Sequence, residues 1–419
     1  MNSCQIEPAA TYSAQAIQFV TRAIYAIATM DTKGEEIAYV RDCIRRAGCD
    51  VRTVDVGTQS PPTVEPDVSR GEVVGRQGFV SEHADRGQAV TAMSEALKRY
   101  LLNEYEAGRL AGVIGIGGSG GTALITAAMR ALPIGLPKLM LSTVASGNTA
   151  PYVDSSDIAM MYSVVDVAGI NAVSRRILAN AAHAMAGMVQ HDARPAETRP
   201  AIGMTMFGVT TPCVTAVREL LSERGFDCLV FHATGAGGRA MEKLVDSGLI
   251  QGVLDITTTE VADEVVGGVF PAGPDRFDKI IDRKIPYVMS LGALDMVNFG
   301  AMETVDRRFA NRRLHVHNAQ VTLMRTTPEE NREIARWIAR KLNRATAPVV
   351  MLIPEKGVSM IDAPGQPFYD PGADASLFDE IEACVNQDEV RRIVRLPYHI
   401  NDRQFSDRLV HEFLHLQRA

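Results

Sequence analysis

A glycine-rich segment is the first place in this sequence where residue types and spacing indicate chemistry. Residues 113–122 read VIGIGGSGGT, with five glycines between Gly115 and Gly121. Glycine loses more backbone freedom on folding than any other residue, so this density indicates that something approaches the backbone closely. The apolar run predicts a strand, and a helix is predicted to start near Thr122. Free backbone N–H groups and the helix dipole would then face an anion.

We therefore predict a cradle for a phosphate or a carboxylate at this turn. Its residues are Gly117, Gly118, Ser119, Gly120, Gly121 and Thr122. The hydroxyls of Ser119 and Thr122 would add hydrogen-bond donors or bind Mg²⁺. The structural alternative is a tight turn that lets the helix pack closely against the strand.

Two phosphate-binding motifs match this segment, and neither matches completely. Gly115 to Gly120 fits GxGxxG, but the dinucleotide-binding fold places an acidic residue about 20 positions later. No Asp or Glu occurs between Gly121 and Val153. Gly115 to Thr122 fits GxxxxGKS/T except that Gly121 takes the place of the lysine. A site for NAD is therefore disfavoured, and a lysine on the phosphates would have to come from another segment.

Other predicted strand ends in the first half are rich in small polar residues. Ligands gather at the carboxyl ends of parallel strands, so these segments should line the same crevice. They contain Asp31, Thr32, Lys33 and Gly34, then Asp55, then Ser146, Gly147 and Asn148. Lys33 is the natural substitute for the missing lysine, and Asp31 or Asp55 could hold a Mg²⁺ ion through water.

The second half has its own polar strand ends. Thr257, Thr258 and Thr259 occupy the position that corresponds to the glycine-rich segment. We predict that these threonines line a cleft for a second ligand, with Glu260 and Asp295 as candidates for general acid and base. Helix capping is the alternative role for Glu260. The spacing of His315 and His317 can chelate a metal, but no third ligand lies nearby in sequence, so polar contacts are the simpler interpretation.

The order of predicted elements indicates how these residues are positioned. A strand at 23–28 is followed by a helix that starts near Thr32, where Thr32 and Glu35 form a capping box, and then by a strand at 51–56. This order is typical of a βαβ unit with parallel strands.

The same order returns later in the chain. Residues 201–235 repeat the first unit, and two further pairs of segments correspond: 107–122 with 247–263, and 136–148 with 284–296. We predict an α/β fold of two Rossmann-like, doubly wound parallel-sheet domains, a duplicated unit with a ligand cleft between the copies. The alternative is that any two doubly wound domains look alike at this level.

Composition shifts give the expected domain boundaries. A polar segment with two prolines, 190–200, is the predicted linker, and it separates a first domain at 23–189 from a second at 201–419. Residues 1–22 form an N-terminal extension. The first domain also carries an insertion at about 59–87, rich in proline, glycine and charge, and loops of this length are often functional.

Bulk composition excludes several classes of protein. The 419 residues are 46% hydrophobic and 22% charged, with a net charge of −7 and a pI of about 5.8. This acidic balance argues against nucleic acid as a partner. The N-terminus lacks the basic start and apolar core of a signal peptide, and no apolar stretch is long enough to span a membrane. The six cysteines form no CxxC pair. We therefore expect reduced thiols, no membrane association and a cytoplasmic location.

Several motifs in order also resemble a known family. ATMDTKGEE, GIGGSGGT, LSTVASGN, LGALDMVNFG, HNAQVTLMRTTPEEN and IPEKGVSMID are similar to segments of the bacterial relatives of the N-terminal, ATP-binding domain of the tomato mosaic virus resistance protein. The resemblance covers residues 22–415. It implies two Rossmann-like subdomains, ATP with Mg²⁺ as ligand, and a homodimer.

The resemblance also implies which residues bind the nucleotide. They are Gly117 to Thr122, Ser146 to Asn148 and, by position, Asp31 to Gly34. We expect an Mg-ATP-binding protein that acts on a small molecule by ATP-dependent transfer to a carboxylate or a sugar acid. Two alternatives remain. One is a nucleotide-gated regulatory module without catalysis, and the other is an enzyme whose glycine-rich segment binds a phosphorylated or carboxylated substrate.

Overall fold

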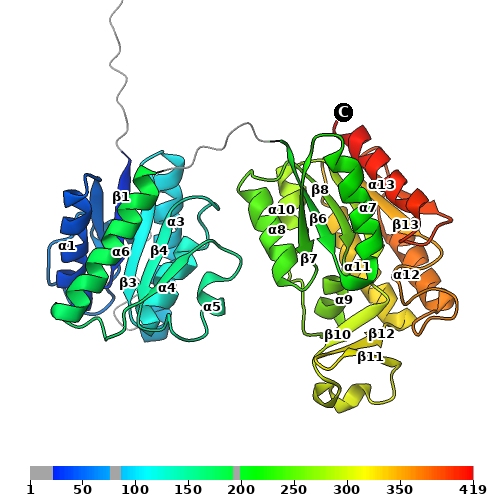
Figure 1. Ribbon diagram of the computed structural model, residues 1–419, viewed down its shortest axis with the longest axis horizontal. Helices are drawn as coiled ribbons and strands as arrows, with labels where there is room; N and C mark the ends of the chain where they lie inside the picture. The colour runs from blue at the N-terminus through cyan, green and yellow to red at the C-terminus, as the bar shows by residue number, and fades with distance from the viewer. Residues whose placement is uncertain (1–21, 76–85, 192–198, 419) are drawn as a thin grey trace, which may run out of the picture. The chain divides into compact units, whose positions relative to one another are not determined.

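The computed structural model describes residues 22–75, 86–191 and 199–418. The chain forms two compact units, one built mainly from residues up to Asp192 and one from Ala193 onward (Figure 1). The predicted N-terminal extension, residues 76–85 of the insertion and most of the linker lie outside the described residues. The five cysteines of the described ranges form no disulfide. None of the helices in these ranges carries an apolar stretch long enough to cross a lipid bilayer.

Unit 1 contains a sheet of five parallel strands in the order β2-β1-β3-β4-β5. The strands are β1 (Ala23–Ala28), β2 (Val51–Asp55), β3 (Leu110–Gly117), β4 (Lys138–Ser142) and β5 (Ala159–Tyr162). Strands β1, β3 and β4 are buried along their whole length, because they are apolar on both faces and helices cover both faces.

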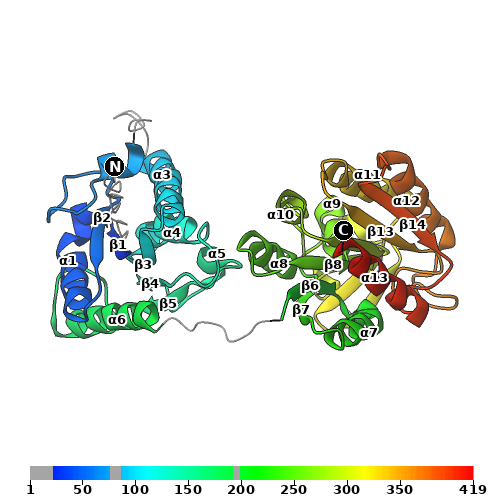
Figure 2. The same ribbon diagram turned by 90° about the horizontal axis from the view of Figure 1, so that it is seen from above.

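Helices α1 (Met30–Arg46) and α6 (Ala172–Gln190) pack together on one face of this sheet, and α3 (Arg86–Glu106) and α4 (Ser119–Met129) pack on the other (Figure 2). Two short helices, α2 (Arg70–Val74) and α5 (Ala150–Val153), complete the unit. Helix α1 starts at Met30, two residues before the predicted start, and the side chain of its N-cap residue, Thr29, makes no capping hydrogen bond. The predicted capping box is therefore wrong.

Unit 2 contains six parallel strands in the order β14-β13-β9-β8-β6-β7. They are β6 (Ala201–Met206), β7 (Asp227–His232), β8 (Gly252–Thr257), β9 (Tyr287–Gly292), β13 (Val349–Pro354) and β14 (Arg391–Leu396). Read from its other edge, this order is β7-β6-β8-β9-β13-β14. Its first five strands therefore follow the same pattern as β2-β1-β3-β4-β5 of unit 1, in which the second strand of the chain lies at the edge and the first lies beside it. The prediction of two Rossmann-like domains is therefore confirmed.

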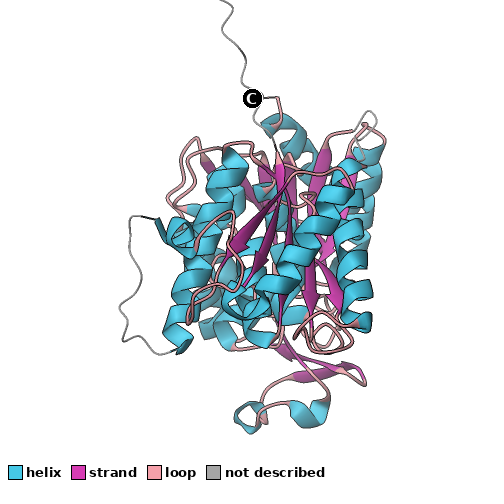
Figure 3. Cartoon of the chain, turned by 90° about the vertical axis from the view of Figure 1, so that its left-hand side faces the viewer, coloured by secondary structure: helices cyan, strands magenta, loops and turns pink. Residues whose placement is uncertain are grey.

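Helices cover both faces of the second sheet as well. Helices α7 (Thr211–Ser222) and α13 (Arg403–Leu416) pack on one face. The other face is covered by α8 (Ala236–Asp246), α9 (Thr259–Val266), α10 (Asp278–Arg283), α11 (Pro328–Leu342) and α12 (Pro371–Cys384). A three-stranded antiparallel sheet extends from one end of the unit (Figures 1 and 3). Its strands are β10 (Met296–Phe299), β12 (Val321–Arg325) and β11 (Leu314–Asn318).

The strand order fixes where a crevice is expected in each unit. In unit 1 the chain leaves β1 toward β2 on one side, and the connections that follow β3 lie on the other side, so the loops after β1 and β3 diverge. The corresponding pair in unit 2 is β6 and β8. The glycine-rich turn follows β3, and the segment Asp31 to Gly34 follows β1, so the fold brings these two predicted site segments to the same edge of the sheet.

Candidate functional site

The junction between β3 and α4 exposes a set of backbone donors. Gly118 is the N-cap of α4 and has no side chain to cap the helix, and Thr122 N donates to Gly118 O at 2.8 Å. No group in the described part of the chain accepts the N–H of Ser119, Gly120 or Gly121. Ser119 and Gly120 are exposed. Helix α4 therefore presents a free, positively polarised end at the crevice of unit 1.

The glycines of this turn differ in what they are needed for. A Cβ on Gly117 would lie 3.0 Å from the backbone of Gly121 and Thr122, so close packing of strand and helix requires glycine there. A Cβ on Gly118 or Gly121 would meet its nearest atom at 3.8 Å, and a Cβ on Gly120 would meet nothing within 4 Å. None of these glycines has a positive φ.

Neither packing nor backbone conformation therefore explains Gly118, Gly120 and Gly121. Glycine costs up to about 1 kcal/mol relative to alanine inside a helix, so Gly120 and Gly121 weaken the start of α4 without a gain for the fold, whereas Gly118 lies at the N-cap, where glycine is tolerated. A ligand that lies against the backbone would explain them, because a Cβ would fill the space that it occupies. The tight-turn alternative holds for Gly117 alone.

Thr122 has a different role from the one predicted. Its side chain is fully buried, and its Oγ1 lies 2.6 Å from Ser142 Oγ, at the end of β4. The same Ser142 Oγ accepts from Val144 N at 3.1 Å. The Thr122 hydroxyl therefore ties the start of α4 to β4 and does not reach the crevice. It positions the cradle, whereas Ser119 keeps an exposed hydroxyl.

The segment after β1 is partly covered by the insertion. Thr63 N and Thr63 Oγ1 both donate to Met30 O, at 2.9 and 3.2 Å. Gly34 is buried, and a Cβ at this position would lie only 2.2 Å from Thr63 Oγ1. Glycine at position 34 thus serves packing, in place of the predicted ligand contact. Thr32 is exposed, whereas Lys33 is half-buried at a kink in α1, with φ −129° and ψ 21°.

The two predicted magnesium ligands, Asp55 and Asp31, differ in how many hydrogen bonds their carboxylates accept from the protein. Asp55 is almost fully buried, and its Oδ1 accepts from Met30 N at 3.1 Å and Gly57 N at 2.8 Å. Its Oδ2 accepts from Arg70 Nε at 2.7 Å. Both oxygens are therefore occupied, and Asp55 does not fit as a metal ligand. Asp31 keeps more freedom, since its Oδ2 makes only two long contacts, to the N–H groups of Gln59 and Ser60 at 3.3 and 3.4 Å.

The loop after β4 lies next to the glycine-rich turn. Thr143 N donates to Gly117 O at 3.3 Å, which joins the two loops directly. Ser146, Gly147 and Asn148 are exposed, and Asn148 Oδ1 accepts from Ala150 N at 3.2 Å. The structure therefore brings the loops that follow β1, β3 and β4 to the same edge of the sheet.

The predicted cleft residues of unit 2 lie inside the unit. Thr257, Thr258 and Thr259 have no exposed surface. Thr257 Oγ1 lies 2.7 Å from Thr210 Oγ1, and Thr258 Oγ1 donates to Ser290 O at 3.2 Å. A small apolar cluster packs at this edge, made of Val209, Ala293, Met296, Leu323 and Phe368. Side chains without exposed surface cannot touch a ligand in this conformation, so the predicted contact is corrected to an internal one.

Glu260 belongs to a buried ion cluster. Its Oε1 accepts from Arg276 Nε at 2.6 Å, and its Oε2 accepts from Gly235 N at 2.8 Å. The same guanidinium binds Glu242 at 3.0 Å and Asp255 at 2.8 Å. Burial raises the pKa of Glu260, and Arg276 opposes this rise. Both of its oxygens accept hydrogen bonds inside the protein and its side chain has no exposed surface, so in this conformation Glu260 has a structural role in place of the predicted acid–base one.

Asp295 lies in a second buried cluster, at the carboxyl ends of β9 and β13. Its Oδ2 accepts from Ser359 Oγ at 2.8 Å, whereas its Oδ1 has no hydrogen-bond partner among the described residues. Arg325 is the cation of this cluster and binds Asp374 at 2.6 Å and Asp362 at 3.6 Å. Burial, and then the Asp362 carboxylate, raise the pKa of Asp295 to about 7. With 1% of its surface exposed, Asp295 cannot act on a ligand in this conformation.

Two arginines that the sequence pattern does not reveal, Arg276 and Arg325, organise these clusters. Arg276 is 16 positions from Glu260 and 21 from Asp255, so spacing along the chain gives no sign of the contact. His315 and His317 lie on β11, and the described residues hold no group of three side chains suited to a metal ion.

Comparison with known proteins identifies the family. The profile described as Uncharacterised protein family (UPF0261) N-terminal domain matches residues 22–194, and that of the C-terminal domain matches residues 199–417. The chain belongs to the UPF0261 family. The two matched domains of UPF0261 agree with the two compact units of the structure.

Individual relatives support this assignment. A UPF0261 protein of Rhizobium meliloti is 56% identical over 391 residues, which cover 92% of this chain and 97% of the relative. The UPF0261 protein of Clostridium tetani is 48% identical, with coverage of 92% and 97%. The ToMV resistance protein Tm-1(GCR237) of Solanum lycopersicum is 46% identical over 94% of this chain. The chain spans 55% of that plant protein. The predicted resemblance is therefore confirmed.

Solved structures add nothing to this assignment. The glycosyltransferase SnogD from Streptomyces nogalater covers 94% of this UPF0261 chain and 95% of its own, but at 8% identity and a TM-score of 0.18. A likeness this weak carries no argument about function.

Proposed function

We propose that unit 1 binds the phosphates of a nucleotide, Mg-ATP, at the crevice between the ends of β1 and β3. The observation that supports this most directly is the start of α4. A Cβ on Gly120 would meet open space, and one on Gly118 or Gly121 would make only ordinary contacts, so neither packing nor conformation demands glycine beside these free N–H groups. Backbone donors at a helix start are suited to phosphate oxygens. ATP rather than another anion is what the resemblance implies.

Charged residues around the crevice fit this ligand. Lys33 extends from the neighbouring segment, and no carboxylate in the described ranges lies within salt-bridge distance of its ammonium group. Lys33 can therefore take the place of the lysine that the glycine-rich turn lacks. Asp31 would hold the Mg²⁺ ion that accompanies ATP, which would neutralise part of the phosphate charge.

The burial of Glu260 and Asp295 favours one version of this function. Both side chains were the candidates for acid–base chemistry, and both are enclosed in ion clusters of unit 2. We therefore favour a nucleotide-binding module over a transferase that uses these two carboxylates. ATP-dependent transfer to a small acid remains a proposal that requires catalytic groups other than these.

A valine at position 120 tests the cradle. Gly120→Val is expected to keep the fold, because a side chain there meets open space, and to weaken Mg-ATP binding by at least about tenfold, because it occupies the ligand's position. Isothermal titration calorimetry on the full chain measures the affinity, and thermal unfolding measures the fold.

Gly187→Val is the matched control for this variant. Gly187 is also a helical glycine with nothing within 4 Å of its Cβ position, but it lies in α6. It should leave Mg-ATP binding unchanged. Unchanged affinity in Gly120→Val would contradict the cradle. Failure of the unmodified protein to bind Mg-ATP, with binding of an organic acid or a phosphate ester instead, would support the substrate-binding alternative.

A further inference from the structure

The loop that follows β5 contains a strained residue that is exposed to solvent. Val164 has a φ of +64°, which is unusual for any residue and a genuine outlier for a β-branched one. Two hydrogen bonds hold the turn in place, since Val165 N donates to Ser163 O and Ser163 Oγ donates to Val165 O, both at 2.7 Å. The side chain of Val164 is 60% exposed. The fold gains no apolar burial from presenting it there.

This loop lies on the same edge of the sheet as the glycine-rich turn. Ser163 N donates to Ser142 O at 3.2 Å, which joins the end of β5 to the end of β4. Strand β4 pairs with β3, whose end carries the proposed phosphate cradle. Neighbouring strands are about 4.8 Å apart, so the ends of β3 and β5 are separated by roughly 10 Å along the edge. A nucleoside covers about this span beyond its phosphates.

The insertion covers part of the edge in the opposite direction. The insertion packs against α1 through Thr63, and a Cβ on Gly57 would lie 2.7 Å from Arg70 Nη2. Asp55 and Arg70 form an ion pair behind this segment. A nucleotide whose phosphates lie at the start of α4 would therefore extend toward β4 and β5.

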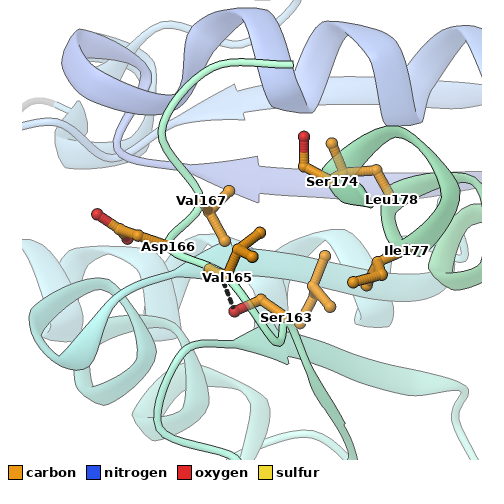
Figure 4. A pocket seen from close by; sticks show the side chains of 8 residues that line it. Ser163, Val165, Asp166, Val167, Ser174, Ile177 and Leu178 are labelled. Carbon is orange, nitrogen blue, oxygen red and sulfur yellow. Dashed lines mark hydrogen bonds between the residues drawn. The ribbon is translucent and has the colours of Figure 1, made fainter. Parts of the chain in front are cut away.

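The loop is packed at its base and exposed at its tip. A hollow of about 10 Å³, no larger than one water molecule, lies beneath it, with Val165 and Val167 of the loop on one side and Ile177 and Leu178 of α6 on the other (Figure 4). Val167 is buried there, whereas Val164 is exposed. The core therefore holds the base of the loop in place, and the tip is accessible to a ligand.

We infer that the loop Ser163–Val167 forms the subsite for the nucleobase, with Val164 at its tip in apolar contact with a planar heteroaromatic ring. This inference rests on the proposed function, because the phosphate cradle fixes where the base can lie. It assigns to Val164 a contact that explains why a strained valine is kept exposed at this edge.

Asparagine at position 164 separates binding from folding. Asn adopts positive φ more readily than Val, so Val164→Asn should unfold at the same temperature as the unmodified chain or above it. The two probes are Mg-ATP and magnesium tripolyphosphate, titrated into the full chain by calorimetry. The unmodified chain should bind Mg-ATP more tightly than tripolyphosphate. Val164→Asn should lose about tenfold in Mg-ATP affinity and nothing in tripolyphosphate affinity.

The outcomes distinguish this inference from the proposed function. An unchanged ratio of the two affinities in Val164→Asn overturns the base subsite, as does equal affinity of the unmodified chain for both probes. Binding of neither probe to the unmodified chain overturns the proposed function itself. Val316→Asn is the control, because Val316 is 55% exposed on β11 of unit 2. Val164→Gly, which also accepts positive φ, serves as the second variant if Val164→Asn unfolds early.

Discussion

At the scale of single residues, the charge balance of its buried cluster determines whether Asp295 is protonated. Among the described residues, Arg325 is the cation that attracts three buried carboxylates, those of Asp295, Asp362 and Asp374. An unpaired charge in such an interior is costly, so protons make up the balance. Burial is the first cause that raises the pKa of Asp295 to about 7 and that of Asp374 to about 8.

This charge balance predicts how stability depends on pH. An Asp in an unfolded chain has a pKa of about 3.9, whereas the pKa of Asp295 in the folded protein is about 7. Between about pH 4 and pH 7 the folded state therefore binds more protons than the unfolded state. The contribution of Asp295 is therefore fully present below pH 4 and is lost as pH rises through 7. Asp295→Asn, which mimics the protonated acid, should reduce the fall in unfolding free energy between pH 5 and 7 by about 1 kcal/mol per pH unit.

Urea titrations at several pH values measure this slope. The control is Asp282→Asn, because Asp282 is a largely exposed carboxylate of the same unit and should leave the slope unchanged. A slope in Asp295→Asn equal to that of the unmodified protein would show that Asp295 is already ionised at pH 5.

At the scale of elements, the junction of β3 with α4 depends on one glycine. Gly117→Ala should lower the free energy of unfolding of unit 1 by about 1–3 kcal/mol, because its Cβ would press on the backbone of Gly121 and Thr122 at 3.0 Å. Gly118→Ala, whose Cβ would meet its nearest atom at 3.8 Å, is the neighbouring control. Equal urea midpoints for the two variants would argue against close packing at this junction.

The sequence alone predicts most of the fold at this scale. Apolar runs bounded by glycine and polar turns place the strands from β1 to β4 and from β6 to β9, and their alternation with helices predicts parallel sheets. The glycine-rich turn is found in the same way, because five glycines in seven residues are visible without a partner. What the pattern cannot tell is which way a polar side chain at a strand end faces.

That direction depends on residues far away in the chain. Glu260 faces inward because Arg276 donates to its carboxylate, and Asp295 faces inward because Ser359 donates to its Oδ2. The hydroxyl of Thr122 forms a hydrogen bond with that of Ser142, 20 positions later. Thr257 contacts Thr210, 47 positions earlier, and Thr259 donates to Met296 O, 37 positions later. These contacts are tertiary, and no local spacing encodes them.

At the scale of the whole molecule, each unit has its own core. Each apolar cluster found among the described residues lies within a single unit. We therefore predict two unfolding transitions in scanning calorimetry, since units with separate cores need not unfold together. Mg-ATP should raise the temperature of only one transition, because a ligand stabilises the unit that binds it.

The variants assign the transitions. Gly117→Ala should lower the transition that Mg-ATP raises, whereas Asp295→Asn should change the pH dependence of the other. A single transition, or a shift of both by Mg-ATP, would mean that the units are energetically coupled.

The glycines at the start of α4 have one more consequence, in how the chain exchanges hydrogen with water. A first turn with Gly118, Gly120 and Gly121 and no capping side chain frays easily, so its amides should exchange faster than those of the following turns. The amides that are open to deuterium are the same N–H groups that would hold the phosphates. The exchange rate of these amides would therefore show whether the site is occupied, because a bound ligand that accepts their hydrogen bonds protects them from exchange.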